Sequence, residues 1–425
     1  MLIELFGRNF GSFRDEFHLS MLATDIDPGN PRGVVEVLLE GEDEPLRLLR
    51  CAAIYGPNAS GKSTVLQAAA ALWYMLASSA FMPSDRPLAP FEPFLLDNKS
   101  KSEPIKLGIR AVVDARVYEY LVEYDQKKIV LERLTEFAPD QPELLFERRE
   151  GDVEGPWTND KQFVLLAESF RSNALLLSLA DRLAPKLAKG LATGFGRLLN
   201  HHDPTWNRHP SFDAKRAARQ ASMDRAGFGA WLLGWLKDAD VGIVGYETKE
   251  MKPADESAGE NLGSGPNVRE DQEMEFQLFH DGMEGPIGFS YRRESEGTRR
   301  IVELAPYIHD LTHGDVNRAY FIDEIGASVH PQLLQALLRH FNCDAPQESV
   351  RGQLIFATHE TALLDAEAKD AVLRRDQVYL TEKDSSGASR LYSVAEFKER
   401  NNLNLRRRYL QGRYGALPAL GQFGD

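Results

Sequence analysis

The sequence predicts an α/β fold, and three segments support this prediction. A glycine-rich turn at 56–64 stands between an apolar run and an alanine-rich run, two carboxylates follow the apolar run 319–322, and a histidine follows the mostly apolar run 353–357. Short apolar runs of this kind are typical of buried strands, and segments between them have helical spacing. We therefore expect a sheet flanked by helices, with polar residues where strands end.

The turn at 56–64 fits the phosphate-binding loop pattern G-x-x-x-x-G-K-[ST]. It follows the strand-like run 48–55 and precedes a run of good helix formers, 65–80. Backbone N–H groups of such a loop, with the helix N-terminus, form an anion site. We expect Lys62 to reach the β- and γ-phosphates of a nucleotide and the Ser63 hydroxyl to ligate Mg²⁺. The predicted nucleotide-binding residues are Gly56, Pro57, Asn58, Ala59, Ser60, Gly61, Lys62, Ser63 and Thr64.

Composition limits the class of protein. The chain has 425 residues, of which 43% are hydrophobic, enough for a folded protein of two or three lobes. The sequence shows no bilayer-spanning apolar run, no signal-peptide pattern and only two cysteines, Cys51 and Cys343. We therefore expect a cytoplasmic protein with no membrane partner. The formal net charge of −14 disfavours nonspecific wrapping of nucleic acid by the whole surface.

The predicted elements divide the chain into five parts. The first, 1–138, carries the phosphate-binding loop and is expected to form the N-terminal half of the fold. Its strand-like runs are 2–6, 17–22, 34–40, 46–55, 105–113, 116–124 and 128–137. The other four parts are a mainly helical insertion at 139–250, a flexible acidic loop at 251–272, a C-terminal half at 273–393 and a tail at 394–425.

Two carboxylates end the predicted strand 319–322. Asp323 can hold the water shell of Mg²⁺ beside the phosphate-binding loop. Glu324, one residue further, is placed to orient and deprotonate an attacking water. An acidic pair after a strand can also be a helix N-cap, but the presence of the loop at 56–64 favours the catalytic interpretation.

His359 follows the predicted strand 353–357 after one threonine. A histidine in such a place is usually structural. Here its position and the order of the motifs favour a contact with the γ-phosphate, whose presence it would report.

Ser295 and Gly297 open a predicted helix with apolar residues at helical spacing from Ile301 to Leu311. Ser295 is a natural N-cap, which is the structural interpretation. The functional interpretation is that both residues, at the positive end of the helix dipole, hold the γ-phosphate of a nucleotide bound to a second subunit.

In this order the motifs resemble those of ABC-type ATPases. Within that class the chain resembles the SMC/RecF/OLD branch and, more closely, the AAA-ATP-like proteins grouped with RloA and with the ATPase subunit of PARIS-type phage defence (AriA-like). The segments that carry the resemblance are 9–13, 56–64, 294–298, 323–331, 358–365, 374–377 and 409–418.

The resemblance implies an ABC-ATPase head: a P-loop NTPase sheet with flanking helices, an antiparallel β subdomain and a helical insertion. It implies ATP and Mg²⁺ as ligands and slow, switch-type hydrolysis in a homodimer or higher homo-oligomer. In that assembly the loop of one copy would meet Ser295 and Gly297 of another, while Glu324 and His359 would act on the attacking water and the γ-phosphate. The implied role is the sensor or scaffold of an anti-phage defence system that controls a separate effector, such as a Toprim-type nuclease.

Other interpretations stay open at this stage. A RecF-like DNA-repair ATPase would bind DNA, with the basic run 406–408 as the contact, although such a run is more often a solvated helix face. A transporter nucleotide-binding subunit is disfavoured by the long insertion. Smaller candidate sites are a His/Asp-rich segment at 200–209, interpreted as a loop, the pair His309 and His313 without a third metal ligand, and Trp206, Trp231 and Trp235, interpreted as core.

Overall fold

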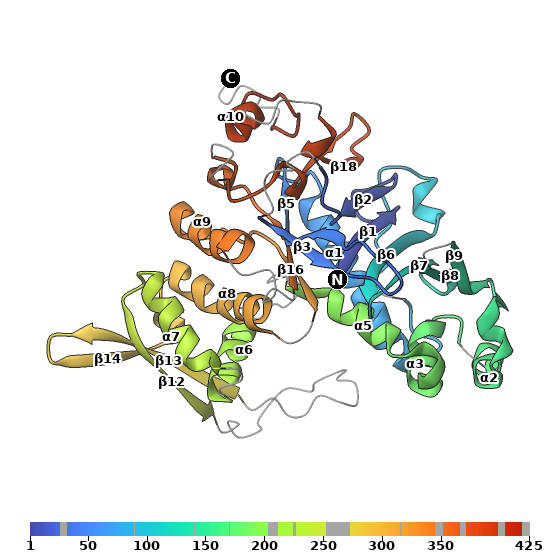
Figure 1. Cartoon of the computed structure of the whole chain (residues 1–425), viewed down its shortest axis with the longest axis horizontal. Coiled ribbons are helices and arrows are strands. Elements are labelled where there is room, and N and C mark those ends of the chain that lie inside the picture. The colour runs from blue at the N-terminus through green and yellow to red at the C-terminus, as the bar shows by residue number, and fades with distance from the viewer. Residues whose placement is uncertain are drawn as a thin grey trace. The chain divides into compact units, whose positions relative to one another are not determined.

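The structure is a computed structural model of the whole chain (Figure 1). It describes residues 1–425 except 26–31, 89, 139–140, 170, 203–210, 224–226, 252–272, 315–316, 345–351, 366–370, 398–403 and 419–425. The predicted acidic loop thus lies outside the described residues, except at its first position. Two compact units are present: unit 1 is Met1–Asp203, Asp315–Ile325 and Gln335–Asp425, and unit 2 is Pro204–Gly314 and Gly326–Leu334.

A six-stranded sheet in unit 1 carries the phosphate-binding loop. Its strands, in spatial order, are β11 (Asn200–His202), β15 (Arg318–Ile322), β16 (Gly352–Ala357), β5 (Cys51–Tyr55), β17 (Val378–Lys383) and β18 (Ser389–Ser393). All neighbours pair in parallel except β17 and β18. Every residue of β5 and β16 is buried, as expected for central strands covered on both faces.

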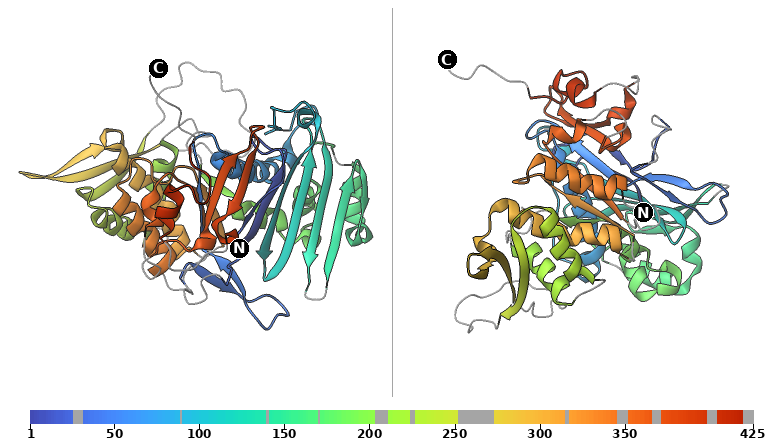
Figure 2. Two further views of the ribbon diagram at one scale, coloured as in Figure 1. Left: turned by 90° about the horizontal axis from the view of Figure 1, so that it is seen from above. Right: turned by 60° about the vertical axis from the view of Figure 1, so that its left-hand side comes forward.

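A seven-stranded antiparallel sheet forms the other half of unit 1, and Figure 2 shows its long strands side by side. In spatial order the strands are β10 (Asp152–Glu154), β9 (Pro142–Arg149), β8 (Ile129–Phe137), β7 (Arg116–Tyr124), β6 (Ile105–Val113), β1 (Leu2–Arg8) and β2 (Phe17–Ser20). The predicted α/β class, with a phosphate-loop sheet and an antiparallel β part, is confirmed. Strands β9 and β10 lie inside 139–250, the segment expected to be mainly helical.

Helix α1 (Lys62–Ser78) lies in the large apolar core to which both sheets contribute. Its alanines at 68–71 are buried, and small side chains let the helix approach the strands closely. The stretch Lys62–Phe81 is long and apolar enough to be a candidate membrane span, with a mean hydropathy of 1.3, but 56% of that window is buried. Such burial is typical of the core helix of a folded unit.

The other helices of unit 1 cover its sheets or follow its strands. They are α2 (Lys161–Ser169), α3 (Leu176–Leu183), α4 (Pro185–Ala188), α5 (Leu191–Leu198) and α10 (Leu405–Leu410). Helix α9 (Pro331–Arg339) begins in unit 2 and ends in unit 1. A short hairpin, β3 (Val34–Val37) and β4 (Leu46–Leu49), precedes β5, and the buried Arg50 separates β4 from the strand that was expected to be continuous with it.

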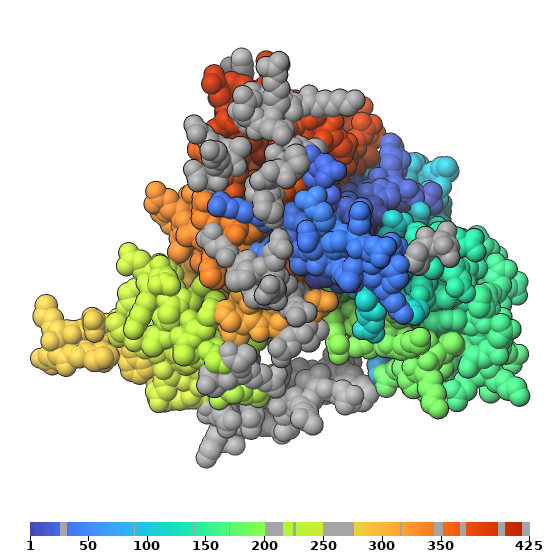
Figure 3. Space-filling view, viewed as in Figure 1, coloured from blue at the N-terminus to red at the C-terminus, as the bar shows by residue number. Residues whose placement is uncertain are grey.

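Unit 2 packs three helices beside a three-stranded antiparallel sheet. The elements are α6 (Ser211–Ser222), α7 (Phe228–Asp238), β12 (Ile243–Met251), β13 (Glu273–Gly282), β14 (Gly285–Ser290) and α8 (Glu296–His313). Trp235 is buried and donates its indole N–H to the carbonyl of Ile301 at 3.3 Å, so it belongs to the core of this unit. In the space-filling view, the tip of the β13–β14 hairpin projects from the helices of its own unit (Figure 3).

The helices expected to form one inserted lobe belong to two units. Helices α2–α5 pack in unit 1, where α3 and α5 contact α1, whereas α6 and α7 pack on α8 in unit 2. Helical periodicity shows which face of a helix is apolar but not which partner covers it, so this division was not visible in the sequence.

Candidate nucleotide-binding site

Three parallel strands bring the predicted phosphate-loop and catalytic residues to one edge of the sheet. In the register, Ile54 of β5 pairs with Ala357 of β16, and Phe356 pairs with Ile322 of β15. The chain therefore leaves all three strands at the same edge, into the loop 56–61, the pair Asp323–Glu324 and the segment Thr358–His359. The carboxyl edge of neighbouring parallel strands is where α/β proteins place ligands.

The loop at 56–61 requires glycine at two positions. Gly56 has φ 152°, and a Cβ atom there would collide with the carbonyl oxygen of Thr381. Gly61 has φ 110° and forms the left-handed N-cap of α1, where a Cβ would lie 2.7 Å from Ser389 Oγ. Both glycines combine a left-handed backbone with close packing, so substitution at either would distort the loop.

Lys62 is the first residue of α1 and is buried. Its ammonium group donates hydrogen bonds to the carbonyl oxygens of Gly56 at 3.0 Å and Pro57 at 2.9 Å. Burial lowers the pKa of the Lys62 amine, while the charges of Asp323 and Glu324 act in the opposite direction. The Lys62 ammonium is thus held by its own loop, close enough to Asp323 and Glu324 for their charges to affect its pKa.

Asp323 and Glu324 form a turn directly after β15. The backbone N–H of Glu324 donates to Asp323 Oδ1 at 3.0 Å, and Glu324 has φ 46°, which is rare for a residue with a side chain. Asp323 is half-buried and Glu324 is exposed. Backbone strain of this kind occurs at functional sites as well as in ordinary turns, so it is compatible with a functional role for this turn.

His359 is exposed after the fully buried strand β16. Desolvation and the positive charge of Lys62 lower the pKa of its imidazole, and Glu324 and Asp323 oppose that shift. The preceding residue, Thr358, donates its backbone N–H to the carbonyl of Ile54 at 3.1 Å, which ties the histidine segment to the strand before the phosphate loop. The structure therefore brings Lys62, Asp323, Glu324 and His359 together.

The N-terminus of α1 has backbone N–H groups that can bind an anion. Its N-cap is a glycine, so no side chain caps the helix, and no acidic residue lies in the first turn. Ser63 and Thr64 are half-buried beside Lys62. Because the first N–H groups of a helix have no partner within it, donors are available here for phosphate oxygens. A loop with this donor set and a buried lysine fits a ligand that carries phosphate groups. Ser63 and Asp323 are the residues that would hold Mg²⁺.

Ser295 and Gly297 lie in unit 2, at the start of α8. The Ser295 hydroxyl accepts the backbone N–H of Thr298 at 3.1 Å, so Ser295 is the N-cap of this helix. A Cβ at Gly297 would lie 2.7 Å from the carbonyl oxygen of Ser328, and the Ser328 hydroxyl donates to Glu296 at 3.0 Å. The start of α8 is thus packed against the segment that follows the acidic pair.

Several residues around the phosphate loop were not found from the sequence. Ser60 and Thr381 join their hydroxyls at 2.6 Å, and Ser389 donates to Ser12 at 2.7 Å, which in turn lies 3.2 Å from the hydroxyl of Thr64. These partners come from β17, β18 and the turn after β1. Ser12 lies in the segment 9–13 that carries the family resemblance, although no role was assigned to it there. Thr381 and Ser389 are more than 300 residues from the loop in sequence and belong to no motif, so no local pattern could have identified them.

The structure gives little support to the alternative sites considered from the sequence. The buried His309 and the exposed His313 stack with ring centroids 4.8 Å apart, and both rings contact Trp231. No cluster of three or more metal-ligating side chains occurs among the described residues. Residues 200–202, expected in a loop, form strand β11; the remainder of 200–209 lies outside the described residues, as does Trp206. In the basic run, Arg406 is paired with Asp365 at 2.6 Å.

Comparison with known proteins identifies the family. The family described as "AAA domain, putative AbiEii toxin, Type IV TA system" matches residues 51–365, which include every predicted site residue. Among solved structures, the SMC head domain from Thermotoga maritima is similar at 13% sequence identity and a TM-score of 0.40, over 92% of this chain and 98% of that chain. No curated protein matches the chain. The match over residues 51–365 shows that the chain belongs to the AAA-domain family of putative AbiEii toxins.

Proposed function

We propose that this protein is a regulatory ATPase that binds and hydrolyses ATP in a site completed by a second copy of the chain. The observation that supports this proposal best is the meeting of Lys62, Asp323, Glu324 and His359 at one sheet edge, where the charges of Lys62 and both carboxylates act on the pKa of His359. Membership in an AAA-domain family agrees with this proposal.

The loop 56–64 would hold the triphosphate. Backbone N–H groups at the uncapped start of α1 would donate to its oxygens, and Lys62 would exchange its two carbonyl partners for the β- and γ-phosphates. Ser63 and Asp323 would hold Mg²⁺, which neutralises charge on the phosphate oxygens. Glu324 would accept the proton of the attacking water, because a carboxylate at this strand end is in reach of the terminal phosphate.

The second copy would contribute the start of its α8. Ser295 and Gly297 stand at the positive end of an 18-residue helix, and Ser295 is exposed. His359, as the neutral imidazole favoured by its lowered pKa, could accept or donate one hydrogen bond at the γ-phosphate. A site divided between two copies ties hydrolysis to assembly, which suits a slow switch better than a metabolic enzyme.

We further propose that the switch serves anti-phage defence in the cytoplasm and controls a separate effector, such as a Toprim-type nuclease. The family description names a putative toxin of a type IV toxin–antitoxin system, which agrees with a role in a system of paired components. The separate effector is proposed from the resemblance of the motifs to those of phage-defence ATPases.

The loop assignment is tested by Lys62→Ala. We expect the purified protein to bind ATP·Mg²⁺ and hydrolyse it slowly, and Lys62→Ala to lose ATP binding because the phosphates lose their main cation. Lys186→Ala, an exposed lysine of α4, is the matched control and should behave as the wild type. Equal ATP affinity in Lys62→Ala and the control, measured by calorimetry, would refute the nucleotide site.

A further inference from the structure

A cavity of about 420 Å³ lies in unit 1, away from the phosphate loop. Its walls come from the second half of α1, from α3 and α5, and from the first residue of β15. Trp73, the lining residue of α1 nearest the loop in sequence, is eleven residues after Lys62, which corresponds to about 16 Å along a helix axis. The cavity is therefore separate from the candidate ATP site.

Two aromatic side chains that line the cavity are largely exposed to solvent. Trp73 is 40% exposed and Phe81 is 49% exposed, and with Ala77 they recur at intervals of four residues along one side of α1 and its continuation. The guanidinium of Arg182 lies 3.8 Å from the centre of the Phe81 ring. Exposed rings of this size offer flat apolar surface to a planar ligand, as in base stacking.

The charges of the cavity favour an anion. Arg182, Arg197 and Arg318 line it, against the single carboxylate of Asp181. Arg197 is exposed and makes no ion pair with another described residue. Guanidinium groups bind phosphate oxygens through paired N–H donors, which makes a phosphate-bearing ligand the best match.

Asp181 adds a requirement for a hydrogen-bond donor. Its Oδ2 accepts the N–H of Thr193 at 3.0 Å and the Thr193 hydroxyl at 2.8 Å, whereas Oδ1 is buried with no partner in the described structure. An unsatisfied buried carboxylate oxygen costs free energy unless a donor reaches it. The N–H groups of a nucleobase are donors of this kind, on a planar ring.

We propose that this cavity binds a mononucleotide, with its base against the Trp73–Phe81 surface and Asp181, and its phosphate among the arginines. The volume lies in the range of small-molecule sites, roughly 300–1,000 Å³. A cavity of this size with three arginines suits one nucleotide better than a nucleic-acid strand, which needs a continuous basic groove. The proposal goes beyond the ATPase function and does not depend on it, and it gives the protein a second site through which a small nucleotide could act.

The test uses the full-length Lys62→Ala protein, in which the phosphate-loop site is disabled. Binding of AMP, GMP and CMP is measured by equilibrium dialysis, with inorganic phosphate and a short single-stranded oligonucleotide as the other probes. We expect about one equivalent per chain of at least one mononucleotide and much weaker binding of phosphate. AMP is informative because it lacks the β- and γ-phosphates that the loop is expected to hold.

Two added substitutions locate that binding. A Cβ at Gly196 of α5 would meet open space, so Gly196→Leu fills the cavity without a clash, and Gly234→Leu, equally open on α7, is its control. Arg197→Ala removes a cation, with the exposed Arg407→Ala as control. We expect at least tenfold weaker mononucleotide binding in both variants and no change in either control. In Arg197→Ala the loss corresponds to one charge-assisted hydrogen bond, and in Gly196→Leu the added side chain takes the space of the ligand.

Outcomes that contradict the second site differ from those that contradict the ATPase proposal. Absence of mononucleotide binding, binding that Gly196→Leu and Arg197→Ala both leave unchanged, or binding of the oligonucleotide alone would each overturn the second site. Thermal unfolding of each variant shows whether it is folded. Absent ATP hydrolysis in the wild type, with mononucleotide binding retained, would remove the ATPase proposal and leave this one standing.

Discussion

The hydrogen bonds of Lys62 show how the phosphate-binding loop is suited to an anion. Its ammonium is held by two carbonyl oxygens of the loop itself, so ATP would replace neutral acceptors with charged ones, which form stronger hydrogen bonds. Burial lowers its pKa, but Asp323 and Glu324 counteract this, which favours the protonated form. Asp323 and Glu324 thus help to keep Lys62 protonated, in addition to their predicted roles toward Mg²⁺ and water.

Glu324 carries the predicted general-base function. Glu324→Gln keeps the size of the side chain but cannot accept the proton of water, so hydrolysis should slow by roughly 10²-fold or more while ATP binding persists. Steady-state phosphate release and ATP affinity, measured on the same preparation, separate the two effects. Glu360→Gln, in the neighbouring histidine segment, serves as the control. Wild-type turnover in Glu324→Gln would exclude this residue from the mechanism.

The titration of His359 reports the charge of Lys62. Desolvation and the nearby ammonium lower its pKa from the ordinary value, which favours the neutral imidazole and moves protonation to lower pH. Lys62→Met removes the positive charge and should raise the pKa of His359, as measured by NMR titration of the nucleotide-free protein. Lys186→Met, on α4, should leave it unchanged. A pKa unaffected by Lys62→Met would mean that the two side chains do not interact.

At the scale of elements, buried polar contacts hold the antiparallel sheet to its helices. Glu132 of β8 accepts the backbone N–H groups of Leu176 and Leu177, both at 2.8 Å, at the start of α3. Tyr120 donates to it at 2.8 Å and the buried Arg148 lies 3.5 Å away.

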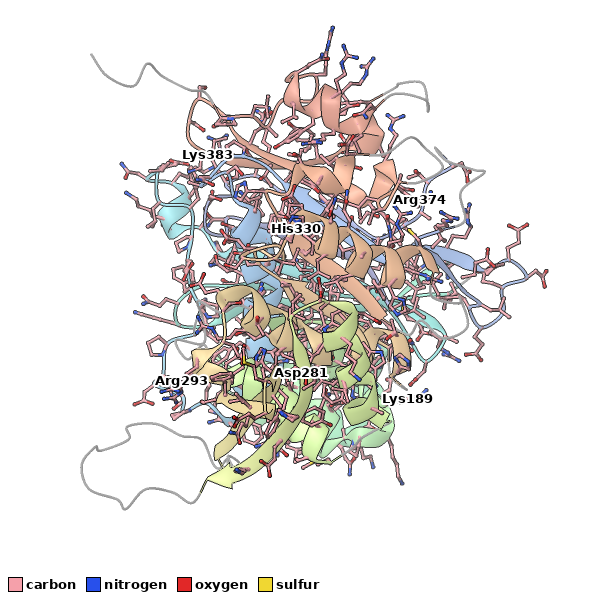
Figure 4. All side chains as sticks on the ribbon, turned by 90° about the vertical axis from the view of Figure 1, so that its left-hand side faces the viewer. Lys189, Asp281, Arg293, His330, Arg374 and Lys383 are labelled. Atoms are coloured by element: carbon pink, nitrogen blue, oxygen red, sulfur yellow. The ribbon has the colours of Figure 1, made fainter. Side chains whose placement is uncertain are left out.

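A second network joins Arg374, labelled in Figure 4, to Asp376 and Thr24, which ties the segment before β17 to the chain after β2.

Breaking the Glu132–Arg148 pair should destabilise the protein strongly. Arg148→Met leaves the carboxylate of Glu132 buried without its cation, and we expect a loss of about 3–5 kcal/mol in the free energy of unfolding. The double variant Glu132→Gln/Arg148→Met should lose less than the sum of the two single changes, since neither buried charge remains. Denaturant unfolding measures all three, and additive losses would show that the two side chains act independently.

At the scale of the whole molecule, hydrolysis should depend on a second copy of the chain. Ser295→Asp keeps an N-cap residue, so α8 should remain folded, but its carboxylate would repel the γ-phosphate across the interface. We expect Ser295→Asp to lose activity and Ser295→Asn, which caps without charge, to retain more of it.

Mixing two inactive variants tests the composite site directly. Ser295→Asp retains an intact phosphate loop and Lys62→Ala retains an intact start of α8, so mixed assemblies contain one complete site and should recover part of the activity. ATPase rate per chain should also rise with protein concentration. Full-rate hydrolysis by a monomer, or by Ser295→Asp alone, would exclude a site shared between copies.

Local sequence was sufficient for the features whose cause is local. The glycines of 56–61, the acidic pair after β15 and the N-cap of α8 depend on backbone conformation and neighbours a few residues away, so the pattern predicted them. The run of good helix formers predicts a helix from 65, whereas α1 begins at Lys62, because its first turn carries the polar residues of the loop motif and lacks the apolar pattern of a helix.

Only the tertiary structure decided which segments meet. The order of the parallel strands brings His359 beside Lys62, places Thr381 and Ser389 around the glycines, and divides the helices of 161–238 between two units. The cavity at Trp73 likewise needs α1, α3 and α5 together. Strand pairing and helix packing join residues far apart in the chain, and their free energy comes from long-range burial, which no short sequence pattern encodes.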